Sequence, residues 1–232
     1  MLLAIVLERH CVLTQSTSTC RPTQFFLKPE SQLHPAAPGL EGEIHQGPMY
    51  LSRASFFADF YVYPALAVIL VAFALFRMPD RWLAVCLTFV IGFGTWTFVE
   101  YIMHRYVLHH LTYIKDQHAK HHLDQKALFG TPTWLSLVVL LVLAAGPAVT
   151  YVGLELGLAF TAGLMMGYLG YTLAHYTIHH WNARPGSYLF RLKQRHALHH
   201  HFNDRGNFGV SNGIWDYVFG TNIVARGNSA DV

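Results

Sequence analysis

The chain has 232 residues, of which 53% are hydrophobic and only 12% are Asp, Glu, Lys or Arg, and its mean hydropathy is +0.28. Because soluble domains carry about 25% charged residues, this composition argues against a freely soluble enzyme and indicates a protein embedded in a membrane. The formal net charge of +3 comes without a concentrated Lys/Arg face, which argues against nucleic-acid binding. Three cysteines without metal-type spacing indicate neither a disulfide framework nor a thiolate metal site.

The first 55 residues are predicted to form a poorly structured segment. Five prolines interrupt every run of periodic hydrophobicity there, namely Pro22, Pro29, Pro35, Pro38 and Pro48. The length of the chain suits one domain. We therefore expect a single membrane domain over residues 56–222, followed by a C-terminal tail over residues 223–232.

Four runs without charged residues follow the N-terminal segment, at 60–76, 82–99, 127–154 and 156–174. A bilayer span needs about 20 apolar residues, so each run is a candidate transmembrane helix. The third run opens on a polar stretch at 131–133, and its span is expected from 134 to about 148. Gly146, Pro147 and Gly153 are predicted to mark the tight turn before the fourth span. The fold class is therefore all-α, with four transmembrane helices in two hairpins.

The number of spans predicts on which side the polar segments lie. Two further crossings return the chain to the same side, so the ends of the second and fourth spans face one compartment. Of the 16 Lys and Arg residues, only Arg77 and Arg81 lie in the connections on the opposite side. Since basic residues favour the cytoplasmic side, we expect an integral membrane protein whose histidine-rich helical cap faces the cytosol.

Histidine is the second unusual feature of the composition. The chain has 16 histidines, and 13 of them lie between His104 and His201. They form four clusters: HRYVLHH at 104–110, HAKHH at 118–122, HYTIHH at 175–180 and HALHHH at 196–201. Each predicted hairpin is thus followed by a spaced pair and then by an H-x-x-H-H triplet, a repetition that makes chance a poor explanation.

The spacing of the histidines predicts how they converge. Residues three or four apart share a helix face, so the triplet beginning at His118 is expected to converge on one point, as is the triplet beginning at His196. His175 and His179 also share a face. His104 and His109 are five apart and diverge by about 140° on a regular α-helix, so this pair requires a helix end or a local bend.

Ten spaced imidazoles are too many for one metal ion and suit two. The ten are His104, His109, His118, His121, His122, His175, His179, His196, His199 and His200. Imidazole is a good ligand for iron or zinc and does not readily oxidise, unlike thiolate. No H-E-x-x-H or E-x-x-H motif is present, which argues against a zinc metalloprotease and a carboxylate-rich di-iron bundle.

Six histidines are expected to have no ligand role. They are His110, His180 and His201, the extra members of each run, and the distant His10, His34 and His45.

Two carboxylates are candidates for holding the ligand rings in place. Ligating histidines usually donate their second ring nitrogen to a carboxylate, a carbonyl or a water. Glu100 lies one helical turn before His104, and Asp216 is the other candidate. We expect no catalytic residues beyond the metal ligands. Tyr168, Gly170 and Tyr171 of the fourth span are candidates for lining an acyl slot.

These motifs resemble the fatty acid hydroxylase and sterol desaturase superfamily of integral membrane di-metal oxygenases. Within it the pattern is most similar to fatty acid 2-hydroxylases. The resemblance covers roughly residues 56–222. The most specific segments are GSYLFRLKQRHALHHH at 186–201 and NFGVSNGIWDYVFGT at 207–221. The family pattern falls on the same ten histidines that the spacing selects.

The resemblance implies a reaction and its cofactors. A di-iron centre, in which zinc can replace iron on purification, would use O2 to hydroxylate a lipid acyl chain at the 2-position. Relatives carry a cytochrome b5 domain with His-Pro-Gly-Gly, of which His34-Pro35-Ala36-Ala37 is only a faint echo. Electrons are therefore expected from a separate partner, cytochrome b5 or ferredoxin with a reductase.

Two alternatives remain open from the sequence. A sterol or carotenoid hydroxylase or desaturase of the same superfamily would use the same histidine frame. A histidine-rich metal transporter belongs to a different class. It is less favoured because these histidines keep fixed helical offsets, and because no predicted span carries the buried Asp/His pairs expected along an ion path.

Overall fold

The computed structural model describes residues 49–224, and this part of the chain is helical, with one isolated antiparallel bridge between Tyr50 and Phe129. The all-α prediction is confirmed. Its elements are α2 (Arg53–Arg77), η2 (Pro79–Arg81), α3 (Trp82–Ile102), η3 (Met103–Leu108), α4 (Thr112–Leu123), α5 (Thr133–Leu140), η4 (Leu141–Ala145), α6 (Gly146–Val152), α7 (Leu154–His180), α8 (Tyr188–His201) and α9 (Ile214–Val218). The expectations for residues 1–48 and 225–232 lie outside the described residues.

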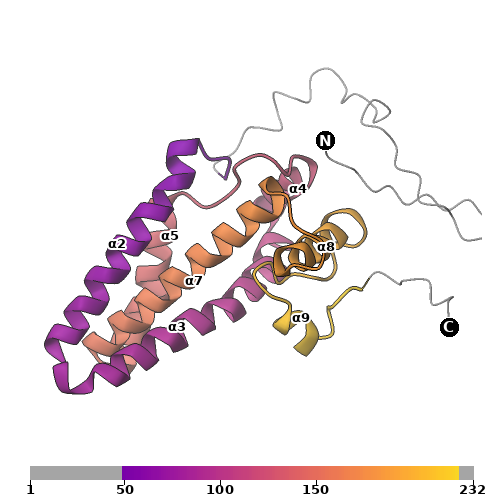
Figure 1. Ribbon diagram of the computed structural model, residues 1–232. Helices are drawn as coiled ribbons and strands as arrows, with labels where there is room; N and C mark the ends of the chain where they lie inside the picture. Colours follow the sequence, from indigo (N-terminus) through magenta and orange to yellow (C-terminus); the bar gives the residue numbers. More distant parts are fainter. Residues whose placement is uncertain (1–48, 225–232) are drawn as a thin grey trace, which may run out of the picture. The chain divides into compact units, whose positions relative to one another are not determined.

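Four helical stretches are long and apolar enough to cross a membrane. They are Arg53–Arg77, Pro79–Leu108, Thr133–Val152 and Leu154–His180. The four predicted spans and their two hairpins are therefore confirmed (Figure 1). The helices are longer than the charge-free runs, because α2 begins at Arg53 and α7 continues to His180.

The turn between the third and fourth spans differs from the prediction. The helix continues through Gly146 and Pro147, which form the first turn of α6, and the chain reverses only at Gly153. Pro147 has no N–H to donate to the preceding turn, and the five residues before Gly146 form the π-helix η4, so the regular α-helical hydrogen-bond pattern is interrupted there. Gly153 has φ +88°, a left-handed conformation that glycine adopts without strain.

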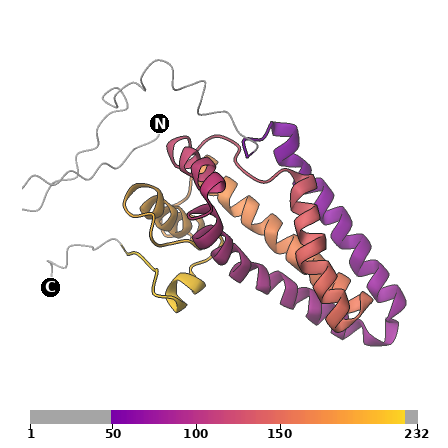
Figure 2. The same cartoon turned by 180° about the vertical axis from the view of Figure 1, so that it is seen from behind.

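Helix α7 is the central element of the bundle. It runs between α2 and α3 in both views of the ribbon (Figures 1 and 2). The most apolar window of α7 is 61% buried, against 17–22% in the other three spans. Glycines permit this packing: a Cβ on Gly163 would lie 2.0 Å from the carbonyl oxygen of Phe89 on α3. Small residues at such contacts are typical of membrane helices.

One buried carboxylate joins three of the spans. Asp59 of α2 is 3% exposed, and it accepts hydrogen bonds from Thr133 Oγ1 of α5 at 2.6 Å and from Tyr168 OH of α7 at 2.9 Å. The sequence predicted no buried Asp/His pair in a span. Asp59 lies just before the charge-free run at 60–76, and its hydrogen-bond donors are hydroxyl groups.

The cap lies beyond one end of the bundle. Helices α4 and α8 follow the ends of α3 and α7 at the same end (Figure 1), as the parity of the spans predicts. Ser187 caps α8 by accepting a hydrogen bond from Phe190 N at 3.2 Å. Lys193 of α8 donates from Nζ to the carbonyl oxygen of Trp181 at 2.7 Å, and so ties α8 to the end of α7.

Candidate metal centre

A π-helix brings His104 and His109 together. In η3 the chain follows the i→i+5 hydrogen-bond pattern, so residues five apart come to nearly the same face. The two rings stack, with centroids 5.2 Å apart and an interplanar angle of 29°. The local bend that the sequence required at this pair is therefore a π-turn, a feature often found at functional sites.

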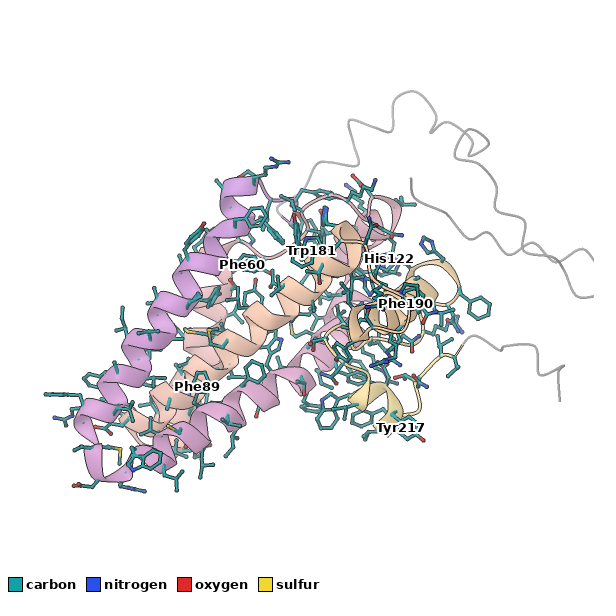
Figure 3. The ribbon with its side chains drawn as sticks, viewed as in Figure 1. Phe60, Phe89, His122, Trp181, Phe190 and Tyr217 are labelled. Atoms are coloured by element: carbon teal, nitrogen blue, oxygen red, sulfur yellow. The ribbon has the colours of Figure 1, made fainter. Side chains whose placement is uncertain are left out.

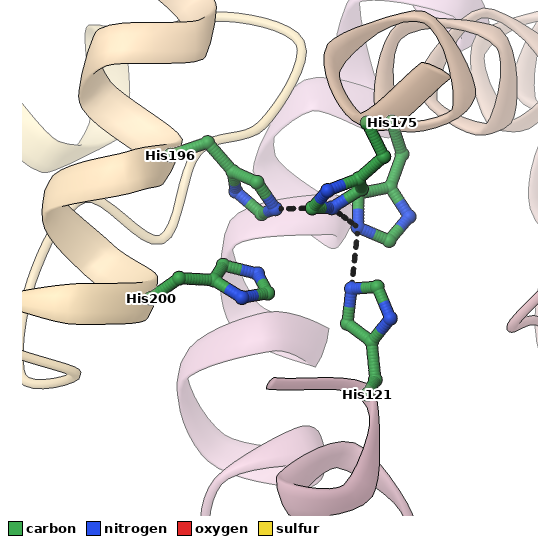
Figure 4. Close-up of side chains that lie close together, drawn as sticks. His121, His175, His196 and His200 are labelled. Carbon is green, nitrogen blue, oxygen red and sulfur yellow. Dashed lines mark hydrogen bonds between the residues drawn. The ribbon is translucent and has the colours of Figure 1, made fainter. Parts of the chain in front are cut away.

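The histidines of the cap and the helix ends form two groups, in each of which one ligand atom per residue lies within 4.8 Å of the others. Group A contains His121, His175, His179, His196 and His200. Group B contains His104, His109, His118 and His199. Figure 4 shows four members of group A, from α4, α7 and α8, with their rings directed toward one another.

Nine of the ten histidines selected from the sequence belong to these groups. The tenth, His122, lies beside group B, with its Nε2 3.0 Å from Nε2 of His118. Its ring also stacks on that of His200, with centroids 4.0 Å apart. His122 therefore lies where the two groups meet, at the cap end of the molecule (Figure 3).

The prediction that each triplet converges on one point is wrong. His121 joins group A while His118 joins group B, and on α8 His196 and His200 join group A while His199 joins group B. Around the axis of an α-helix, the side chains at i+3 and i+4 point about −60° and +40° away from the side chain at i. The three rings of one triplet therefore spread far enough to contact two sites. The pairing of His175 with His179 is confirmed, since both are in group A.

The spacing of the ring nitrogens fits metal coordination. Nε2 of His121 lies 3.0 Å from Nε2 of His175, and Nε2 of His109 lies 3.1 Å from Nε2 of His199. With metal–nitrogen bonds of about 2.1 Å, two ligands at a right angle are about 3.0 Å apart, and two tetrahedral ligands about 3.4 Å apart. The separations of both groups therefore suit octahedral or five-fold sites.

Burial favours the neutral form of the histidines in groups A and B, which can donate a lone pair. Burial, reinforced by neighbouring imidazoles, holds the pKa of His118, His121 and His196 well below the usual histidine range. Burial also lowers the pKa of His109 and His199 to about 4. Neutral imidazole is the form that binds metals.

His200 shows most clearly that group A suits a metal ion. Both of its ring nitrogens are buried and lack a hydrogen-bond partner among the described residues. A buried polar group left in this state costs about 1–3 kcal/mol. A metal ion in group A would bind one of these nitrogens, so the donor set and its burial fit a metal site.

Glu100 and Asp216 do not hold histidine rings directly. Glu100 is 3% exposed, and its Oε1 accepts hydrogen bonds from the backbone N–H groups of Val210 at 2.6 Å and Ser211 at 2.8 Å. Asp216 is fully buried and accepts from the backbone N–H of Phe208 at 2.8 Å. Both carboxylates were candidates for holding ligand rings, but they accept hydrogen bonds from backbone N–H groups of residues 208–211 instead.

A cavity of about 110 Å³ lies beside both groups. His175 of group A and His104 of group B line it, together with apolar side chains that include Phe56, Met103 and Leu108. Two of the three residues predicted for an acyl slot, Tyr168 and Tyr171, also line it, whereas a Cβ on Gly170 would meet nothing within 4 Å.

The extra histidines lie outside both groups. His110 Nδ1 contacts the carbonyl oxygen of Arg105 at 2.8 Å, His180 stacks on Tyr176, and His201 Nε2 is 3.0 Å from Gln125 Nε2. His10, His34 and His45 are among the residues that the structure does not describe.

Fold and site together define a class: a membrane protein whose histidine clusters can hold metal ions. Comparison with protein families then shows to which family the chain belongs. The model for "Fatty acid hydroxylase" matches residues 89–221, which is more than half of the chain. The chain belongs to the fatty acid hydroxylase family, as its motifs predicted.

Individual relatives agree with this assignment. Fatty acid 2-hydroxylase of Mus musculus is 35% identical over 155 residues, which cover 58% of this chain and 39% of the mouse protein. Ceramide very long chain fatty acid hydroxylase scs7 of Schizosaccharomyces pombe is 35% identical over 150 residues, covering 57% of this chain and 41% of that protein. The chain therefore spans about two fifths of the length of these relatives.

A solved structure has the same fold. The chain described as "Full length scs7p (only hydroxylase domain visible)" superposes with a TM-score of 0.63 and 25% sequence identity. The match covers 76% of this chain and 70% of that chain.

Proposed function

We propose that this chain is an O2-dependent fatty acyl hydroxylase that places a hydroxyl group on carbon 2 of a lipid acyl chain. The observation that carries the proposal is the largely apolar cavity walled by His104 of group B and His175 of group A. An acyl chain in this cavity would lie against both histidine groups. The names of the relatives, fatty acid 2-hydroxylases among them, support the position of attack.

Two iron ions are the proposed cofactors. The ligands are the members of groups A and B together with His122, whose Nε2 contacts His118. When bound, the ions supply the activation of O2, in a reaction that combines R–H, O2, two electrons and two protons to give R–OH and water. A histidine-only donor set suits this chemistry because imidazole binds iron well and does not readily oxidise.

The chain's own contribution is to position the acyl group and to exclude water. The ring of Tyr171 stacks on that of His175, with centroids 5.9 Å apart, and so closes the cavity wall beside group A. Phe56 of α2 and Met103 of η3 provide apolar surface. Such exclusion of water and orientation of substrate is the usual role of the protein in cofactor-dependent chemistry.

We further propose that the groups face the cytoplasm and receive electrons from a separate protein. Only Arg77 and Arg81 lie in the connections at the opposite end of the bundle, and the excess of basic residues at the histidine end favours the cytosolic side. Cytochrome b5 or a ferredoxin with its reductase would supply the two electrons. The hydroxylase domain proposed here covers residues 56–222, between the N-terminal segment and the tail at 223–232.

Expression in a host that lacks 2-hydroxy fatty acids tests the proposed function. Hydrolysed lipids should contain 2-hydroxy acids, and His179→Ala, in group A, should abolish them. The matched control is His180→Ala, because His180 is the next residue and lies outside both groups. A change confined to sterols, carotenoids or unsaturated chains would reject attack at carbon 2.

A further inference from the structure

The C-terminal loop, which we define as residues 206–213, contacts only one of the two histidine groups through its carbonyl oxygens. The carbonyl oxygen of Phe208 lies 2.6 Å from Nδ1 of His104, and that of Gly206 lies 2.8 Å from Nδ1 of His199. A carbonyl oxygen can only accept a hydrogen bond, so Nδ1 is the N–H of each ring. Nε2 of both rings, which faces group B, therefore carries the lone pair.

Group A has no such support in the described part of the chain. Nδ1 of His121, His196 and His200 is buried without a hydrogen-bond partner. In group B, only His118 has Nδ1 in this state. The two groups thus differ in how their rings are held, although their Nε2 separations are alike.

Two buried carboxylates hold the loop in place. Asp216 accepts from the backbone N–H groups of Phe208 and Gly209, both at 2.8 Å. Glu100 of α3 accepts from the backbone N–H groups of Val210 and Ser211, at 2.6 and 2.8 Å. Four successive amides, 208–211, are therefore fixed by two side chains that are 0% and 3% exposed.

The backbone conformation of the loop is restricted at two positions. Asn207 has φ +56°, a left-handed conformation that asparagine tolerates better than most residues. Its Oδ1 accepts from Ile223 N at 2.9 Å. A Cβ on Gly209 would lie 2.0 Å from the carbonyl oxygen of Asn212. The carbonyl groups on either side of Asn207 are therefore presented to His199 and His104 in fixed directions.

We propose that Glu100 and Asp216 are positioning residues for one metal site only, and that the two sites are consequently unequal. They act through the loop: its carbonyl groups fix the tautomer and orientation of His104 and His199 and strengthen Nε2 as a donor. Group A binds its ion without this support. The inference rests on the proposed function in one respect, that both groups hold a metal ion.

Metal retention in single-site proteins tests this inference. His175→Ala with His179→Ala leaves group B as the only intact group, and His104→Ala with His109→Ala leaves group A. Asp216→Asn is then added to each protein, and competition with a chelator gives the affinity for iron or zinc. We expect Asp216→Asn to weaken binding about 10–100-fold in the group B protein, the usual effect of losing such a supporting contact, and to leave the group A protein unchanged.

Two further variants keep the test decisive. Glu100→Gln, which retains one acceptor oxygen for the loop amides, should give the same selectivity if Asp216→Asn fails to fold. Asp59→Asn is the matched control, since Asp59 is an equally buried carboxylate bonded to Thr133 and Tyr168 rather than to the loop. Equal weakening of both groups, or of neither, would overturn the inference. Absence of metal from the unsubstituted protein would instead overturn the proposed function.

Discussion

His104 and His109 lie five residues apart in the sequence, yet their imidazole rings stack at 5.2 Å because the helix widens to a π-turn at Met103–Leu108. On a regular α-helix the same two side chains would diverge by about 140°. The widened turn therefore lets the end of a membrane span contribute two ligands to group B.

Substitution of the adjacent residues His109 and His110 tests directly whether group B binds a metal ion. His109→Ala should lower the metal content from about two ions per chain to about one, since a missing ligand opens a site whose remaining ligands are fixed. His110→Ala should leave it unchanged, because His110 lies outside both groups. Metal analysis of the purified proteins measures this, and equal metal content in the two variants would contradict the assignment of group B.

The sequence predicted the four spans, and nine of the ten histidines that it selected fall in groups A and B. A charge-free run long enough to span a bilayer is a transmembrane helix candidate with few other structural interpretations. Histidines three or four residues apart share one face of a helix. The division of each triplet between two groups was not predictable, because it depends on how α4 and α8 are rotated relative to α7. The role of the loop was also missed: backbone carbonyl groups support His104 and His199, and a sequence carries no direct sign of them.

Two glycines on α7 should respond oppositely to alanine. In Gly163→Ala the new Cβ would lie 2.0 Å from the carbonyl oxygen of Phe89, so the α3–α7 contact must open. Overpacking of this kind costs about 1–3 kcal/mol. Gly170→Ala meets nothing within 4 Å and should be neutral or stabilising by about 0.5–1 kcal/mol. Thermal unfolding in detergent compares them, and equal stability would reject the close packing of α3 on α7.

The proposed orientation predicts which residues a membrane-impermeant thiol reagent can reach. Single cysteines in the connection 78–81 and at Gly153 should be labelled from one side of the membrane. A cysteine at His201 should be labelled only from the other side, the cytosolic one. The three native cysteines, Cys11, Cys20 and Cys86, must be replaced first. Labelling of His201→Cys from the same side as Gly153→Cys would contradict the four-span topology.

The cavity predicts a difference between two adjacent residues of α7. Thr172 is 8% exposed and lines the cavity, whereas Leu173 is 45% exposed and is absent from its lining. Thr172→Phe should fill the cavity and abolish acyl hydroxylation while the metal content is retained. Leu173→Phe should leave turnover unchanged. Full turnover by Thr172→Phe, measured in reconstituted vesicles, would show that the substrate binds elsewhere.

Isotope labelling tests the central claim most directly. The protein is reconstituted in lipid with iron, a reduced ferredoxin or cytochrome b5 system and ¹⁸O2, and the hydrolysed acyl chains are analysed by mass spectrometry. The account predicts 2-hydroxy acids that carry one ¹⁸O atom at carbon 2, formed only with the electron donor present. A hydroxyl group labelled from water, or one placed on another carbon or on a sterol, would contradict it.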